Sequence, residues 1–202
     1  LAISLLLGIG LFFLLPALIS GLIARFADLS AWGVNLIEGG IRLFMLVGYL
    51  WLIGKMADIK RVFMYHGAEH KTINAFEDGA ELTPEEVDQY SVEHPRCGTS
   101  FILTLVLLSI VIFSFFGPLP LHWRLISRLL MIPVLAGISY EYIRLLSKIL
   151  DTRFGQMISK PNLALQRLTT RPPSRDMIEV AIRAFVEMKA MEDEGESAAS
   201  AK

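Results

Sequence analysis

Three residues with metal-binding and acid–base chemistry stand close together in an apolar sequence: His66, Glu69 and His70. On a helix, a spacing of four residues puts both imidazoles on one face, where they could hold one metal ion. Glu69 is the candidate general base, because a carboxylate beside the ligands can take a proton from a metal-bound water. His-x-x-Glu-His is the order of the inverted zincin metalloproteases. The plain alternative is an interfacial helix whose polar side chains face water.

The same polar stripe continues one and two turns further along the expected helix, at Asn74 and Glu77. We expect these side chains to support the imidazoles and fix their tautomers. A wholly solvated helix remains the alternative, since Lys71, Asp78 and Glu81 are polar as well.

A catalytic zinc ion needs a third protein ligand, and the sequence offers two sources. Glu141 is a carboxylate inside an apolar stretch, where an ionisable group is costly and is a functional candidate. Its alternative role is an ion pair with Arg144 or Arg42. The other source is His94 with Cys97, for which the alternative is a turn with a packed thiol.

Further polar residues could contact a substrate near these ligands. Arg96 and Thr99 could hold a carboxylate or a phosphate at the start of a helix, where the helix dipole favours anions. The alternative is that Thr99 caps this helix while Arg96 contacts lipid headgroups. Glu38 and Arg42 lie on one helical face and could line the site, or form a structural pair inside a bundle.

Composition indicates that these residues belong to a membrane protein. Hydrophobic residues make up 53% of the 202 positions and charged residues 19%, and no charged residue occurs between Gly98 and Trp123. The net charge of −1, without basic runs, argues against nucleic acid as a partner. Because Cys97 is the only cysteine, an intramolecular disulfide and a cysteine-based zinc finger are excluded.

Apolar stretches of about 20 residues are long enough to cross a bilayer as helices. Four stretches qualify, and they cover residues 1–24, 31–57, 99–116 and 124–150. We therefore expect an all-α, polytopic membrane bundle of about four transmembrane helices. The sequence begins inside an apolar run without an initiating Met, so we also expect residues upstream of Leu1.

Basic residues collect after the second and fourth spans, which predicts that residues 58–98 and the C-terminus lie on the cytoplasmic side of the membrane. Residues 151–191 should form a cytoplasmic helical region. It includes an amphipathic helix from about Arg175 to Met191, with Ser174 as its N-cap. The stripe that should pack consists of Ile178, Ile182, Phe185 and Val186. Residues 192–202 are expected to be disordered. The predicted parts are thus 1–57, 58–98, 99–150, 151–191 and 192–202.

Four longer strings resemble a known family. They are RVFMYHGAEHK at 61–71, HPRCGTSF at 94–101, YEYIR at 140–144 and LQRLTTRPP at 165–173. Together they resemble the YqhQ-type family of bacterial multi-pass membrane proteins, and the resemblance extends over residues 35–182. It implies a metal-dependent enzyme that binds metal through His66, Glu69 and His70, with His94 and Cys97 in the same functional region. It implies no particular substrate.

These observations predict a membrane-embedded, zinc-dependent hydrolase, with a metalloprotease as the first choice. A membrane peptide is the first substrate class and a lipid-linked molecule the second, while iron or manganese would also suit the ligands. Two alternatives remain. The chain could be a scaffold or assembly factor with a structural metal site, or a transporter subunit with an intramembrane polar path. A homo-oligomer is compatible with each.

Overall fold

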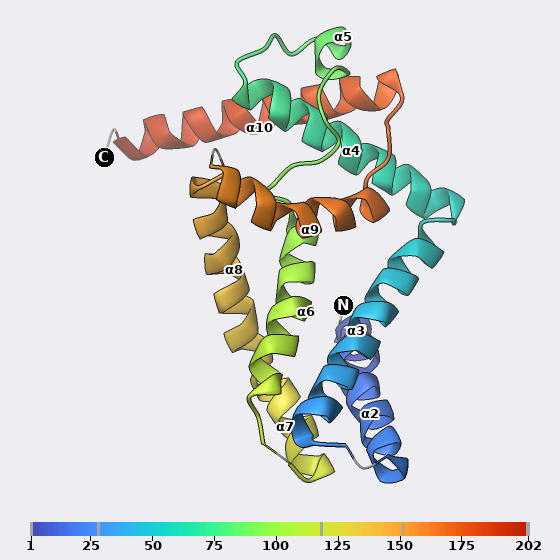
Figure 1. The fold of residues 1–202 in the computed structure, drawn as a ribbon. Helices are drawn as coiled ribbons and strands as arrows, with labels where there is room; N and C mark the ends of the chain where they lie inside the picture. Colours follow the sequence, from blue (N-terminus) through green and yellow to red (C-terminus); the bar gives the residue numbers. More distant parts are fainter. Residues whose placement is uncertain (1, 28, 118, 151, 201–202) are drawn as a thin grey trace. The chain divides into compact units, whose positions relative to one another are not determined.

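The computed structural model describes residues 2–27, 29–117, 119–150 and 152–200. All regular structure in these residues is helical, so the all-α prediction is confirmed (Figure 1). The chain divides into two compact units. The first consists of residues 1–51 and 95–165, and the second of residues 52–94 and 166–202. Each unit therefore combines two stretches that are far apart in the sequence.

Two helices of the first unit are long and apolar enough to cross a membrane. The first is a continuous helical run, Ala2–Phe26, composed of α1 (Ala2–Ile9), a π-helical turn η1 (Gly10–Leu14) and α2 (Leu15–Phe26). Pro16 lies inside this run and has no N–H for the carbonyl of Phe12, which accepts from Nε of Arg42 at 2.9 Å. The second is α3 (Ala31–Ile53), which has 23 residues. Both agree with the first two predicted spans.

The other two predicted spans are less regular. The third corresponds to α6 (Gly98–Ser114), an apolar helix of only 17 residues. The fourth is divided into α7 (Leu121–Leu130) and α8 (Ile132–Lys148), which meet at an angle of 44° and can count as one broken span. In the described residues, two helices therefore qualify as membrane spans, or three with the bent pair. These apolar helices indicate a membrane protein.

Small and hydroxyl-bearing residues allow close packing inside the first unit. α6 packs against α8 (Figure 1). Gly39 on α3 lies against Ile110 on α6, whose Cγ1 atom would be 2.5 Å from a Cβ atom at position 39. Ser100 and Ser109 on α6 and Ser139 on α8 are fully buried. Small side chains at such contacts are typical of helices that associate within membranes.

The second unit is built around α4 (Ala57–Glu77) and includes α5 (Pro84–Val87) and α10 (Arg175–Ser200). α9 (Arg153–Thr169) begins in the first unit and ends in the second. α10 packs along α4 through a core formed by Ala68, Ala75, Val87 and Ile178. The side chains of the two alanines are small, so α10 can pack close to the backbone of α4.

The amphipathic C-terminal helix begins directly after Ser174, as predicted. Of its predicted stripe, Ile178 is buried, Ile182 packs against the core, and Phe185 contacts Phe76 with ring centroids 4.8 Å apart. Val186 is different, because 49% of its surface is exposed. The segment after residue 191, predicted to be disordered, continues the helix to Ser200; its glutamate and alanine residues are strong helix formers. Residues 201 and 202 lie outside the described residues.

Candidate metal centre

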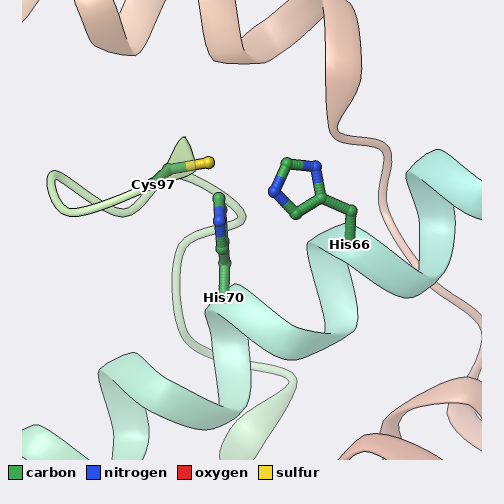
Figure 2. A group of neighbouring side chains, drawn as sticks. All are labelled: His66, His70 and Cys97. Atoms are coloured by element: carbon green, nitrogen blue, oxygen red, sulfur yellow. The ribbon is translucent and has the colours of Figure 1, made fainter. Parts of the chain in front are cut away.

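His66 and His70 project from the same side of α4 (Figure 2). Their ring centroids are 4.3 Å apart. The Nδ1 atom of His66 lies 2.9 Å from the carbonyl oxygen of Thr169, and Nδ1 of His70 lies 2.7 Å from that of Val92. Because a carbonyl oxygen can only accept, each neutral imidazole carries its proton on Nδ1 and its lone pair on Nε2. This is the tautomer in which Nε2 ligates a metal.

Gly67, between the two histidines, allows another backbone segment to approach α4. The carbonyl oxygen of Arg171 lies where a Cβ atom at position 67 would collide with it. The N–H of Arg171 also donates to the carbonyl of Phe63 at 3.0 Å. The close approach brings the carbonyl of Thr169 within reach of His66. The glycine of the motif therefore has a structural role that the sequence analysis did not assign.

Polar side chains of α4 also hold the irregular segment 88–94. Lys71 donates to the backbone carbonyl of Asp88, and its Nζ lies 3.1 Å from Asp88 Oδ1. The amide of Asn74 donates to the carbonyls of Ser91 and Glu93 at 2.9 and 3.0 Å. Asn74 was expected to support the histidines. Asn74 fixes the segment that contains the carbonyl acceptor for His70. It therefore supports the His70 imidazole indirectly, through the backbone.

His94 ends this segment and is almost fully buried. The side-chain amide of Gln166 makes two hydrogen bonds with the backbone of His94. It accepts from His94 N at 2.9 Å and donates to His94 O at 2.7 Å. The Nε2 atom of His94 is 3.4 Å from Glu77 Oε2, and its ring centroid is 5.8 Å from that of His70. Glu77, expected beneath the ligands, thus contacts His94. A metal bound by His94 while this contact lasts would have to use Nδ1.

Glu69 has a different environment from the two histidines. Its exposed side chain lines a groove of 360 Å³ between α4 and α10. The other lining residues are mainly apolar and comprise Tyr65, Thr72, Ile73, Val180, Ala181, Ala184, Phe185 and Met188. The role of Glu69 as a general base stays a prediction, and any substrate it served would contact this groove.

Cys97 and Arg96 belong to the first unit. Cys97 is buried and caps α6, since its sulfur accepts from the N–H of Thr99 at 3.4 Å and lies 3.2 Å from Thr99 Oγ1. The expectation that Thr99 itself caps this helix is wrong, because the helix begins at Gly98. Arg96 and Cys97 line a cavity of 510 Å³ between α6 and α8. The remaining lining residues are Gly98, Phe101, Tyr140, Ile143, Arg144 and Ser147.

Glu141, the alternative third ligand, lies on α8 in the first unit. Its side chain is 64% exposed, and Oε1 lies 3.5 Å from Arg144 NH1. This is the ion pair that the sequence offered as the alternative to metal binding. Its role as a ligand stays a prediction.

Glu38 and Arg42 form the predicted structural pair at 2.8 Å, and both are buried in the first unit. Arg128, which was not among the predicted residues, donates to both oxygens of Glu38 at 2.7 and 2.9 Å. Both guanidiniums also contact the Phe113 ring, with Cζ–centroid distances of 5.6 Å for Arg42 and 3.9 Å for Arg128. A basic residue in an apolar span needs such a partner, and this requirement was the available signal for Arg128.

The fold and these residues define a class: an all-helical protein with apolar, membrane-type helices and a histidine pair on a separate helix. Residues 1–191 match the family model described as "Protein of unknown function (DUF1385)", and the chain belongs to this family. It is 40% identical over 156 residues to "Uncharacterized protein YqhQ" of Bacillus subtilis (strain 168), and the match covers 77% of this chain and 49% of the relative. The chain thus spans about half the length of this curated relative. No solved structure matches it. The YqhQ-type resemblance is confirmed.

Proposed function

We propose that this chain is a membrane-embedded, metal-dependent hydrolase in which His66 and His70 bind a divalent transition metal, zinc in the first instance. The observation that carries the proposal is the pair of Nδ1 contacts to the carbonyls of Thr169 and Val92. Such contacts fix the ring orientation and leave the lone pair on Nε2, as metal-ligating histidines require. A solvated histidine needs neither contact.

Cys97 is the third ligand that we propose. His66, His70 and Cys97 each offer one nitrogen or sulfur donor, a set that suits zinc (Figure 2). Cys97 follows His94 by three positions, and three extended residues reach about 10 Å. Because Gln166 holds the backbone of His94, the short connection limits how far the thiol can lie from that residue. His94 through Nδ1 and Glu141 are the competing ligands.

A metal held in this way would polarise a carbonyl or phosphoryl group of the substrate and activate water. The chain's own residues would bind the substrate. Arg96 and Arg144, in the cavity next to Cys97, suit an anionic group, while Phe101 and Ile143 suit an apolar one. Glu69, which lines the groove between α4 and α10, would act as the general base that accepts a proton from the attacking water. A membrane peptide or a lipid-linked molecule fits this combination of charge and apolar surface.

The second candidate is a scaffold or assembly protein with a structural metal site. It is favoured by the structural contacts of the other residues in the motif. Gly67 admits the backbone of Arg171, and Lys71 holds Asp88, so this face of α4 has a packing role even without catalysis. A site closed by four protein ligands, with no position left for water, would also be structural.

Metal content separates a metal-binding protein from one without metal. We expect about one zinc per chain in detergent-purified wild type, measured by elemental analysis. It should be lost in His66→Ala and His70→Ala and retained in His122→Ala, a control on an exposed histidine of α7. Cys97→Ser and Glu141→Gln then identify the third ligand. A wild type that takes up no metal even on direct titration contradicts both candidates.

Activity separates the hydrolase from the scaffold. Glu69→Gln should retain zinc and lose the hydrolysis of membrane peptide or lipid-ester substrates. Glu81→Gln, a change on another exposed glutamate of the second unit, should retain both. Unchanged hydrolysis in Glu69→Gln would remove the general base from the proposal, and zinc-loaded protein without any hydrolysis would favour the scaffold.

We further propose that the second unit and the C-terminus lie on the cytoplasmic side of the inner membrane. The support is the basic residues that follow α3 and that lie at and after the end of α8, since such residues are enriched in cytoplasmic segments. They include Lys55, Lys60, Arg61, Lys148 and Arg153. A C-terminal reporter that is active only in the cytoplasm should be active, and activity of a periplasm-specific reporter would reverse the orientation.

A further inference from the structure

The first unit contains a second cavity, of 520 Å³, between α2 and the start of α7. Its lining residues are Leu18, Gly21, Leu22, Ala24, Arg25, Leu119, Leu121 and Arg124. The guanidinium groups of Arg25 and Arg124 therefore line one cavity together with leucine side chains. None of the described residues that line this cavity is acidic. We propose that this cavity binds the phosphate group of an anionic phospholipid.

Arg124 is held in place by α2. One of its terminal nitrogens, NH2, donates to the carbonyl of Ala17 at 2.7 Å. The same nitrogen lies so close to Gly21 that a Cβ atom there would collide with it. A glycine at this position thus makes room for the guanidinium beside the helix backbone.

The Nε atom of Arg124 is buried and has no hydrogen-bond acceptor among the described residues. A buried donor without an acceptor is costly, and native structures usually supply a partner. A phosphate in the cavity suits this guanidinium group, because guanidinium groups bind phosphates through short, charge-assisted hydrogen bonds. Arg25 contributes a second positive charge to the same cavity.

The position of the cavity along the helices indicates that the phosphate belongs to a lipid. Arg25 lies in the last turn of α2, at the end of the apolar run Ala2–Phe26, and Arg124 lies in the first turn of α7. The ends of membrane-spanning helices lie at the level of the headgroups. Leu18 and Leu22, which line the cavity two turns and one turn before the end of α2, are 43% and 55% exposed and can contact acyl chains. A free phosphate would use the arginines and not the leucines.

The test is lipid binding to the full chain in detergent, measured by native mass spectrometry. The probes are phosphatidylglycerol, phosphatidylcholine and inorganic phosphate. Wild type should bind phosphatidylglycerol in preference to phosphatidylcholine, since two arginines repel the choline cation. Arg124→Gln should weaken phosphatidylglycerol binding about tenfold or more, the loss expected for a charge-assisted contact.

Arg25→Gln changes an exposed side chain, so it tests the cavity without disturbing the fold, and it should also weaken binding. Arg153→Gln, on an exposed arginine outside the cavity, should bind as wild type does. Equal binding by wild type, Arg25→Gln and Arg124→Gln would overturn the proposal. Inorganic phosphate that displaces the lipid at similar concentration, and in the same arginine-dependent way, would overturn the assignment to a lipid.

Discussion

The side-chain amide of Gln166 pairs with the backbone of His94 through two hydrogen bonds, accepting from its N–H at 2.9 Å and donating to its carbonyl at 2.7 Å. Both residues are buried, and 72 positions separate them in the sequence. The side chain thus replaces the strand or helix partner that a buried backbone normally has. It fixes the segment that leads from the second unit to Cys97.

Gln166→Leu should destabilise the second unit, because it removes the two hydrogen bonds that this side chain makes with the buried backbone of His94. Each such hydrogen bond contributes about 0.5–1.5 kcal/mol. Thermal unfolding in detergent measures the loss. Gln89→Leu, which changes an exposed glutamine of the same unit, is the control and should unfold close to wild type. Equal unfolding temperatures for the two variants would show that the pairing contributes nothing.

Gly67→Ala should also destabilise the second unit, although alanine normally favours a helix. The new methyl group would meet the carbonyl of Arg171 and push the segment that carries the His66 acceptor away from α4. We expect a lower unfolding temperature and weaker zinc binding. Gly48→Ala on α3, where nothing lies within 4 Å of the new Cβ atom, is the matched control. If Gly67→Ala is as stable as that control, the close approach is not required.

Glu38→Gln should be among the most damaging single substitutions in the first unit. It leaves Arg42 and Arg128 buried against one another without a carboxylate, and breaking a buried ion pair costs about 3–5 kcal/mol. Glu141→Gln changes an exposed pair, worth about 0–1 kcal/mol, and should unfold nearly as wild type does. Unfolding of both variants at the same temperature would contradict a stabilising role for the buried network.

Ile178→Ala should destabilise the contact between α10 and α4. Ile178 is almost fully buried in the core of the second unit, and removal of a buried isoleucine side chain costs about 2–5 kcal/mol. Val186→Ala, on the same helix but half exposed, should change stability by about 0.5 kcal/mol or less. Limited proteolysis of α10, followed over time, distinguishes the two variants. Equal protection of the helix would show that Ile178 does not anchor it.

Tyr90 provides a prediction about pH. Its hydroxyl donates to Asp78 Oδ2 at 2.8 Å, and this hydrogen bond raises the pKa of Tyr90 above its ordinary value. Because the folded-state pKa is the higher one, the contribution to stability is present below the ordinary tyrosine pKa. It disappears as the pH rises through the raised value. The difference in tyrosinate absorbance between wild type and Tyr90→Phe reports this pKa, and Asp78→Asn should lower it. An unchanged titration in Asp78→Asn would refute the cause.

Local features of the chain determined much of this fold. Long apolar stretches specify α1–α3 and α6–α8, because apolar surface in a helix has to be covered by lipid or protein. Spacing of four residues placed His66 and His70 on one side of α4. The sequence Pro172-Pro173-Ser174 ended one element and began α10 at Arg175. Each of these signals acts over a few neighbouring residues or along one helix, so it can be read without knowledge of the partners.

Tertiary structure alone decided which distant groups meet. Gln166 with His94, Arg128 with Glu38, and the Arg171 carbonyl with Gly67 are pairs that no periodicity connects. It also decided that Glu69, adjacent to His70 in the sequence, lies in the groove beside α10. Neighbouring helical residues point about 100° apart, so packing of α10 on one face of α4 separates their environments. The physical reason is the same in every case: a buried polar group or a packed face needs a partner. The sequence shows which groups need a partner, but it does not show which residue supplies it.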